Sequence, residues 1–298
     1  MAQMSTIVVS AADEGYAGLL FDLVDSLRAA AVPDLQIGCL DLGLTDATRA
    51  RLGPLVDAIV RPEWPFRPHP VFGASPRHLS RAVRPFLPAY FPGHGTYIWL
   101  DADCWVQDRM ALQGLVHAAS TGALTVVPAA DRSYIHSDDA RGWVDRRYRM
   151  ALGDDAADRL RPFNYINCGV LALRAKAPHW VAWERRFQAA LDRWEGDFLS
   201  DQAVLNALVY LDAMPSIMLP AEYNWICHLR LPLWLAEKRR FANPNYPWTP
   251  IGIMHNTLNN KGQGVATLST DGTLVNTVLS YAGFKALDMA ATPQLSRG

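Results

Sequence analysis

The chain has 298 residues, half of them hydrophobic, and a formal net charge of −1. This length fits one large α/β domain or two small ones, and the hydrophobic half is enough to bury a sizeable core. The near-neutral charge argues against general nucleic-acid binding, which needs a basic face, so we expect no nucleic-acid partner.

The chain carries few signs of an extracellular or membrane protein. Its four cysteines, Cys39, Cys104, Cys168 and Cys227, include no CxxC pair. This spacing disfavours a structural zinc site or a disulfide framework and predicts reduced thiols. The N-terminus has no signal peptide, and no apolar run is long enough to span a bilayer. We expect a cytoplasmic protein without a transmembrane segment.

The first part of the chain alternates strand and helix patterns. Apolar periodicity predicts strands at 6–10 and 35–40 and helices at 19–31 and 45–52. This order predicts a parallel sheet covered by helices. Residues 62–76 are rich in proline and aromatic residues and predict a loop. Residues 79–90 predict a helix that Pro85 and Pro88 kink.

The later part continues the same pattern. We expect strands at 97–100, 124–127 and 164–173, helices at 180–194 and 201–210, and a helix with a loop within 131–160. Residues 252–255 predict the last strand of the main sheet. Beyond residue 264, a strand–turn–strand around Asp271-Gly272 predicts a small appendage. We therefore expect a catalytic domain over 1–262 and an appendage over 263–298.

The most informative segment joins an apolar strand to two carboxylates, Asp101 and Asp103. Strand side chains alternate faces, so residues two apart share a face. At the carboxyl end of a central parallel strand, this face opens on the ligand crevice. Two carboxylates there suit Mg²⁺ or Mn²⁺, which would clamp a diphosphate and stabilise it as a leaving group. The alternative is a solvated turn after a buried strand.

Six segments carry a family resemblance through their order and spacing. They are VSAADEGY at 9–16, DAD at 101–103, FNYINCGVL at 163–171, LSDQAVLN at 199–206, LPAEYNW at 219–225 and HNTLNNK at 255–261. Together they resemble the retaining glycosyltransferases of the glycogenin and bacterial lipopolysaccharide galactosyltransferase group (glycosyltransferase family 8). The resemblance runs from residue 5 to residue 261. It implies the GT-A fold, a single Rossmann-like α/β domain with a mostly parallel sheet and flanking helices.

The resemblance also implies roles for individual residues. The metal ligands it implies are Asp101, Asp103 and His255. The donor-binding residues it implies are Asp13 and Tyr16 at the base, Arg84 or its neighbour Arg81 at the donor, Asn167 and Gly169 beside the sugar, and Lys261 at the diphosphate. The catalytic residues it implies are Asp201 and Gln202 near the reacting carbon and Asp131 in contact with the donor sugar.

Several of these residues have simpler interpretations. Asp13 and Ser200 are also suited to cap the helices that follow them, and Arg84 to lie on a solvated helix face. Two positions depart from the family pattern. Cys168 stands where the family has alanine or serine, and Leu258 stands where it has glycine. The second departure bears on the conformation of the loop and on the reach of Lys261.

The resemblance implies a metal-dependent hexosyltransferase that uses Mn²⁺ or Mg²⁺ and a UDP-sugar donor and retains the anomeric configuration. Two routes to retention stay open: double displacement through Asp201 or Asp131, and front-face attack with the leaving phosphate as base, which we favour. The acceptor is a glycan, a lipid-linked sugar or a protein. The segment 227–248, rich in arginine and tryptophan, predicts contact with an acceptor or with the inner membrane surface, or a lid packed on the core.

Three other functions are consistent with parts of the pattern. A family member without activity would bind a nucleotide sugar or a glycan only. A phosphatase of the haloacid dehalogenase type also has DxD after an apolar strand, but it needs a threonine or serine soon after the second acid, where this chain has Cys104-Trp105. A nucleotidyltransferase would need a glycine-rich basic loop after the first strand.

Overall fold

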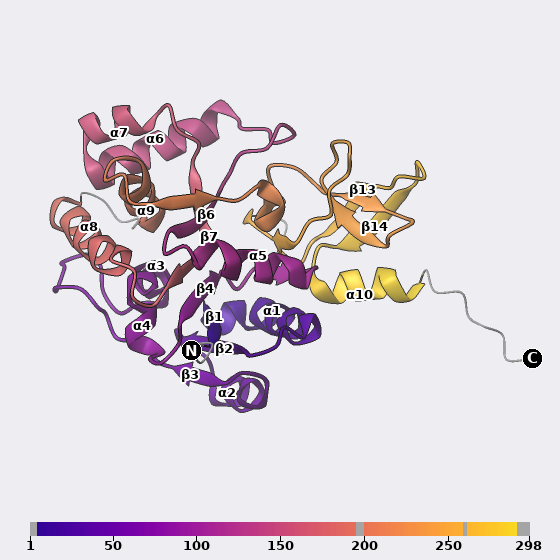
Figure 1. Cartoon of the computed structure of the whole chain (residues 1–298), viewed down its shortest axis with the longest axis horizontal. Coiled ribbons are helices and arrows are strands. Elements are labelled where there is room, and N and C mark those ends of the chain that lie inside the picture. Colours follow the sequence, from indigo (N-terminus) through magenta and orange to yellow (C-terminus); the bar gives the residue numbers. More distant parts are fainter. Residues whose placement is uncertain (1–4, 195–199, 259–260, 291–298) are drawn as a thin grey trace, which may run out of the picture.

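The computed structural model describes residues 5–194, 200–258 and 261–290, which fold around a seven-stranded sheet in the order β3-β2-β1-β4-β7-β6-β8 (Figure 1). The strands of this sheet are β1 (Thr6–Ala12), β2 (Leu35–Asp41), β3 (Ala58–Val60), β4 (Thr96–Leu100), β6 (Leu124–Pro128), β7 (Ile166–Arg174) and β8 (Ser216–Met218). Only β7 runs antiparallel to its neighbours in this sheet. The predicted mostly parallel α/β sheet is confirmed.

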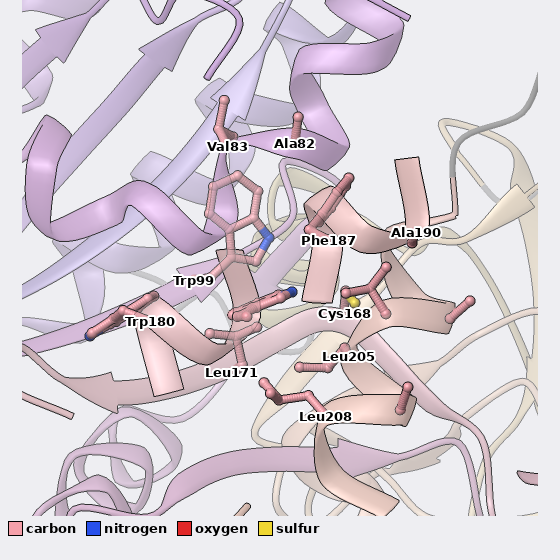
Figure 2. Close-up of a cluster of buried hydrophobic side chains, with 14 of the residues drawn as sticks. Ala82, Val83, Trp99, Cys168, Leu171, Trp180, Phe187, Ala190, Leu205 and Leu208 are labelled. Carbon is pink, nitrogen blue, oxygen red and sulfur yellow. The ribbon is translucent and has the colours of Figure 1, made fainter. Parts of the chain in front are cut away.

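Helices cover both faces of the sheet. They are α1 (Ala17–Ala30), α2 (Asp46–Leu52), α3 (Pro76–Ala82), α4 (Leu87–Tyr90), α5 (Arg109–Ala119), α6 (Asp138–Leu152), α7 (Asp154–Leu160), α8 (His179–Arg193) and α9 (Asp201–Tyr210). Because strand side chains alternate, Ile98 packs in the core with α1 and α5, whereas Trp99 packs on the opposite face. Figure 2 shows Trp99 and Leu171 of the sheet facing Phe187 of α8 and Leu205 of α9.

The helix predicted over 79–90 is broken, as its prolines suggested. Helix α3 ends at Ala82, a 3₁₀ turn covers Arg84–Phe86, and α4 follows. Pro85 and Pro88 lack the N–H groups that a continuous helix would use. The break turns Arg84 inward, and only 5% of this residue is exposed. The interpretation of Arg84 as part of a solvated helix face is therefore wrong.

The strand predicted at 252–255 exists, but its assignment to the main sheet is wrong. Strand β12 (Ile253–His255) lies in a separate three-stranded sheet between β5 (Cys104–Val106) and β9 (Trp225–Ile226). The reason lies in the turn after β4, which the Cys104 N–H closes by donating to the Asp101 carbonyl at 2.9 Å. Beyond this turn β5 offers β12 an antiparallel partner, so His255 pairs with Cys104.

The segment 227–248 mostly packs on a third apolar cluster. Strands β10 (Leu233–Leu235) and β11 (Arg240–Ala242) form a hairpin in which Trp234 and Phe241 are buried. Tyr246 and Trp248 beyond it are exposed. Most of this segment thus agrees with the predicted lid packed on the core.

The last described elements are a hairpin, β13 (Gly264–Leu268) and β14 (Leu274–Val278), and helix α10 (Tyr281–Ala290), which lies beside it (Figure 1). The Asp22 carboxylate of α1 accepts the backbone N–H groups of Tyr281 and Ala282 and so caps α10 from the far end of the sequence. All four cysteines are buried and free. Among the described helices, none is long and apolar enough to cross a bilayer.

Candidate active site

A cavity of about 350 Å³ opens at the carboxyl ends of β1 and β4, where ligands of open α/β sheets bind. The structure brings many of the residues predicted from the sequence to its wall. Those that line it are Asp13, Tyr16, Arg81, Arg84, Asp101, Asp103, Asp201, Gln202 and Lys261. These residues come from distant parts of the chain, and the fold gathers them around one space.

Asp101 is held by two side chains through one of its oxygens. The Trp99 indole N–H donates to Asp101 Oδ1 at 2.7 Å, because the two residues lie two apart on the same face. The Arg84 guanidinium donates to the same oxygen at 2.5 Å. The other oxygen, Oδ2, lies 3.8 Å from His255 Nε2. Asp101 therefore keeps one oxygen directed at the histidine.

Asp103 lies between two basic groups. Its Oδ1 is 3.2 Å from His255 Nε2, and its Oδ2 is 2.8 Å from Lys261 Nζ. Burial alone would raise the pKa of Asp103, but the charges of His255 and Lys261 outweigh it and hold this pKa well below its usual range. Asp103 is therefore a carboxylate anion at neutral pH, even though only 7% of the residue is exposed.

His255 is fully enclosed, with 2% of its surface exposed. Its Nδ1 lies 2.8 Å from the side-chain oxygen of Asn224, and its Nε2 faces Asp103 and Asp101. Burial would lower the pKa of His255, but the two carboxylates outweigh burial and raise it. The imidazole thus lies with one nitrogen toward the acids and the other toward a neutral amide.

Arg84 binds a second carboxylate, that of Asp201 at the start of α9, and stacks on the Trp99 ring at 4.5 Å. Asp201 is 4% exposed, and burial raises its pKa although Arg84 and Arg81 act in the opposite direction. The expected cap is also present, since Ser200 accepts the Ala203 N–H at 3.4 Å. Both interpretations of the helix start therefore hold.

At the opposite end of the cavity, Lys261 Nζ donates to the Tyr16 hydroxyl at 2.8 Å and lies 4.6 Å from the centre of the Tyr16 ring. Tyr16 is 40% exposed, so one part of its ring remains accessible. Asp13 caps the turn by accepting the Tyr16 N–H at 3.1 Å and also lines the cavity. Its structural role and the predicted binding role are compatible.

Asp131 and Gly169 are not among the described residues that line the cavity. Asp131 instead accepts hydrogen bonds from Ser133, Asn243 and Asn245, so it braces the loop that carries Tyr246. Its placement does not support the predicted contact with the donor sugar.

Gly169 makes room for the histidine. A Cβ at this position would lie 2.3 Å from Cε1 of His255 and 2.7 Å from Nδ1 of the same ring. Asn167, also outside the described cavity wall, accepts the Gly169 N–H at 2.7 Å and donates to Gln202 at 3.2 Å. Neither residue lines the cavity, but Gly169 leaves room for His255 and Asn167 orients Gln202.

Leu258, the departure from the family glycine, has φ of +52°. This is the left-handed region that glycine adopts freely and that a bulky side chain disfavours. Position 258 therefore keeps a glycine-like φ despite the leucine.

Cys104 is the nearest thiol to the acids. Together with Asp103 and His255 it forms a group of side chains, within the described part of the chain, whose ligand atoms lie within 4.8 Å of one another. Burial raises the pKa of the Cys104 thiol well above its usual value, and the sulfur lies 3.8 Å from the Gly169 carbonyl oxygen. A neutral thiol is a poor ligand for a hard cation, so Asp101 is the better third donor.

One backbone carbonyl joins the segments that follow Asp103 and His255. The Leu279 oxygen accepts the Trp105 indole N–H at 2.9 Å and the amide of Asn256. The Asn256 N–H in turn donates to the Asp103 carbonyl at 2.8 Å. No pattern in the sequence predicts this contact, because it joins residues far apart in the chain.

The fold is that of the GT-A class of glycosyltransferases. The structure of the galactosyltransferase LgtC in complex with donor and acceptor sugar analogues matches this chain with a TM-score of 0.57 and 18% identity, over 95% of each chain. An active-site mutant of LgtC, in which glutamate replaces glutamine, matches with a TM-score of 0.52 and 17% identity over the same shares.

The apo structure of the bifunctional glycosyltransferase WbbM matches with a TM-score of 0.53 and 20% identity. The match covers 75% of this chain and 40% of WbbM, so the chain spans less than half the length of that protein. By sequence, no protein-family model and no curated protein matches. The likeness confirms the predicted GT-A fold.

Proposed function

We propose that this protein is a metal-dependent glycosyltransferase that moves a hexose from a nucleotide diphosphate sugar, most simply a UDP-sugar, to an acceptor hydroxyl. One observation carries the proposal. Tyr16, Lys261, Asp103, Asp101 and Asp201 all line one cavity of a GT-A fold. Contacts connect them in this order: Tyr16 to Lys261, Lys261 to Asp103, Asp103 to Asp101 through His255, and Asp101 to Asp201 through Arg84. This is the order of groups that a nucleoside, a diphosphate and a sugar would need.

The donor atoms fit a divalent cation. Asp101 Oδ2, Asp103 Oδ1 and His255 Nε2 face one another, and two carboxylates with one imidazole suit Mn²⁺. The Lys261 ammonium already lies against Asp103, which shows that the position attracts positive charge. A bound cation would neutralise the charge that develops on the departing diphosphate.

The nucleoside end is formed by Asp13 and Tyr16. The accessible part of the Tyr16 ring offers a flat surface on which a base can stack. Asp13 lines the same cavity and is held in place by the turn it caps. Lys261 contacts both Tyr16 and Asp103, so it lies between the residues that would hold the base and those that would hold the metal. From there it would bind the diphosphate.

The sugar end is formed by Asp201 and Gln202. Arg84 neutralises Asp201 and fixes its orientation, which makes this carboxylate a poor nucleophile. Gln202 uses its amide oxygen to accept from Asn167, so its NH₂ group is left to donate. One of the LgtC structures is described as an active-site mutant in which glutamate replaces glutamine. Gln202 is the glutamine we place in that role here.

These placements favour front-face attack. The bond between C1 and the phosphate oxygen breaks, and its electron pair leaves with the diphosphate. The acceptor oxygen forms a new bond to C1 on the same face, and its proton moves to the leaving phosphate oxygen. Asp201 orients the sugar hydroxyls and is not itself glycosylated.

The test is a thermal-shift screen of nucleotide sugars with and without Mn²⁺. A ligand at a hundredfold over its Kd should stabilise the protein by about 2.7 kcal/mol. We expect one donor to stabilise the wild type only with metal, and Asp103→Ala to lose the shift. The matched control is Asp155→Ala, which replaces an exposed aspartate on α7. This variant should keep the thermal shift. If no nucleotide sugar shifts the wild type under any metal condition, the proposal is wrong.

A second candidate is a protein that binds the donor without transferring it, and the backbone strain at Leu258 favours it. Mass spectrometry of the incubated donor separates the two, because only an enzyme releases the nucleoside diphosphate. The phosphatase alternative loses support, since Cys104 and Trp105 after the second acid are buried in β5.

A further inference from the structure

Asn224 belongs to the LPAEYNW segment, which the family resemblance covers without assigning this residue a role. It is 1% exposed and comes directly after the 3₁₀ turn Ala221–Tyr223. Both ends of its amide are used. Its oxygen lies 2.8 Å from His255 Nδ1, and its nitrogen donates to Asn167 Oδ1 at 3.2 Å.

The direction of these hydrogen bonds is fixed by one backbone group. The Gly169 N–H can only donate, and it donates to Asn167 Oδ1 at 2.7 Å. This identifies the Asn167 oxygen, so the Asn224 group that faces it must be NH₂. The Asn224 oxygen then faces His255 Nδ1 and must accept a hydrogen bond from its N–H. The chain continues in the same direction, because the Asn167 NH₂ donates to Gln202 Oε1 at 3.2 Å.

We propose that Asn224 is a positioning residue that holds the His255 N–H at Nδ1 and so keeps the Nε2 lone pair directed at the metal site between Asp103 and Asp101. The inference rests on the proposed metal-dependent function. An imidazole that ligates a metal through one nitrogen commonly donates its other N–H to a fixed acceptor, which sets the tautomer and the ring orientation. Here the acceptor is a neutral amide, itself locked by Asn167.

The surroundings of the His255 ring explain why it needs the hydrogen bond to Asn224. The space beside His255 is so tight that Gly169 has no room for a Cβ against the imidazole. The ring nitrogens have different neighbours, an amide oxygen at Nδ1 and two carboxylates at Nε2. Without the Asn224 oxygen, the neutral ring would place its proton on Nε2, where Asp103 accepts it. That tautomer offers no lone pair to a metal.

The experiment measures Mn²⁺ binding directly, by the loss of the free-ion electron paramagnetic resonance signal, in the full-length protein without nucleotide. Asn224→Leu keeps the side-chain volume, and Asn224→Ala leaves room for water. We expect whichever of them folds to bind Mn²⁺ about 10- to 100-fold more weakly than the wild type. Asn224→Asp restores an acceptor for Nδ1 and should recover most of the affinity.

The matched control is Asn206→Ala. Asn206 is also a buried asparagine, but its hydrogen bonds go to the backbone of Ile166 and Gln202. The Asn206→Ala variant should have a lower melting temperature but an unchanged Mn²⁺ affinity. It therefore separates a loss of ligand positioning from general destabilisation of the fold. Wild-type Mn²⁺ affinity in the leucine or alanine variant, or equal losses in the alanine and aspartate variants, would overturn the inference. The proposed metal site is wrong if the wild type binds no Mn²⁺, or if Asp103→Ala leaves that binding unchanged. In either case the inference about Asn224 is wrong as well.

Discussion

Lys261 Nζ lies 2.8 Å from Asp103 Oδ2, so an ammonium group already neutralises a carboxylate that we assign to the metal. A cation that binds between the acids must compete with this ion pair, and the diphosphate would then attract the ammonium away. Binding of the cation and binding of the diphosphate are therefore linked through Lys261. Removing this lysine should strengthen the first and weaken the second.

We predict that Lys261→Met binds Mn²⁺ more tightly than the wild type in the absence of nucleotide, by roughly tenfold, since one charge-assisted contact no longer competes. The same variant should bind a UDP-sugar more weakly, because the diphosphate loses its partner. Titration of Mn²⁺ with and without UDP measures both effects. Lys285→Met, which removes a surface lysine near Asp25, is the control. A weaker Mn²⁺ affinity in Lys261→Met would contradict the competition.

Arg84 supports two carboxylates at once, and we predict that removing it is costly. Arg84→Met leaves Asp101 and Asp201 without their shared cation, and breaking a buried ion pair costs about 3–5 kcal/mol. Urea unfolding measures the loss. Adding Asp201→Asn should recover part of it, because the uncompensated buried charge is gone.

The control for this prediction is a surface pair of the same chemistry. Arg186 pairs with Asp212 on the outside of α8, so Arg186→Met should cost at most about 1 kcal/mol. An Arg84→Met cost no larger than that of Arg186→Met would show that the buried network contributes little to stability.

Asp41 gives the fold a predictable pH dependence. Burial would raise its pKa, but the N–H groups of Leu44 and Gly43 and the guanidinium of Arg49 lower it below the usual 3.8. A depressed pKa in the folded state means that the stabilisation is present above pH 3.8 and is lost as the pH falls through the folded-state pKa. We therefore expect the free energy of unfolding of the wild type to exceed that of Asp41→Asn by about 1 kcal/mol at neutral pH.

This difference should shrink on acidification below pH 3.8, which melting curves between pH 3 and pH 7 can follow. Asp46→Asn is the control, because Asp46 pairs with the same Arg49 but is fully exposed. A stability gap that stays constant across this range would show that the charge of Asp41 is not its source.

We predict that Leu258→Gly stabilises the protein by up to about 1 kcal/mol, because it removes a bulky residue from a left-handed conformation. The leucine side chain is 66% exposed, so little apolar burial is lost. Leu258→Ala is the matched control, since alanine keeps the Cβ that causes the strain. Equal melting temperatures for the two variants would refute the strain.

Much of the fold could be predicted from the sequence, because the elements of the main sheet have strong local patterns. Strands β1, β2 and β4 begin or end within two residues of their predicted bounds, and α9 matches its prediction. The placement of β12 could not be predicted, since its partner β5 is set by the turn after Asp101. Apolar periodicity identifies a strand but does not say which strand it pairs with.

The site, too, could be predicted from the sequence only in part. The residues of compact motifs, such as Asp101, Asp103 and Gln202, reach the cavity, because the end of one strand or helix carries them there. Asp131 does not, since a short loop can turn its side chain toward a structural role. Asn224 lies within a compact motif, but its partners come from two distant segments, so only the structure could assign its contacts.

The contact of Leu279 with Trp105 and Asn256 bears on the order in which the protein becomes competent. A chain emerging from the ribosome can assemble its N-terminal strands first. The Leu279 carbonyl is synthesised long after Trp105 and also after Asn256, the two residues that it joins. The sheet can therefore fold during translation, but the proposed site gains this support only once residue 279 has left the ribosome. Until then, the segments that carry Asp103 and His255 lack their shared acceptor.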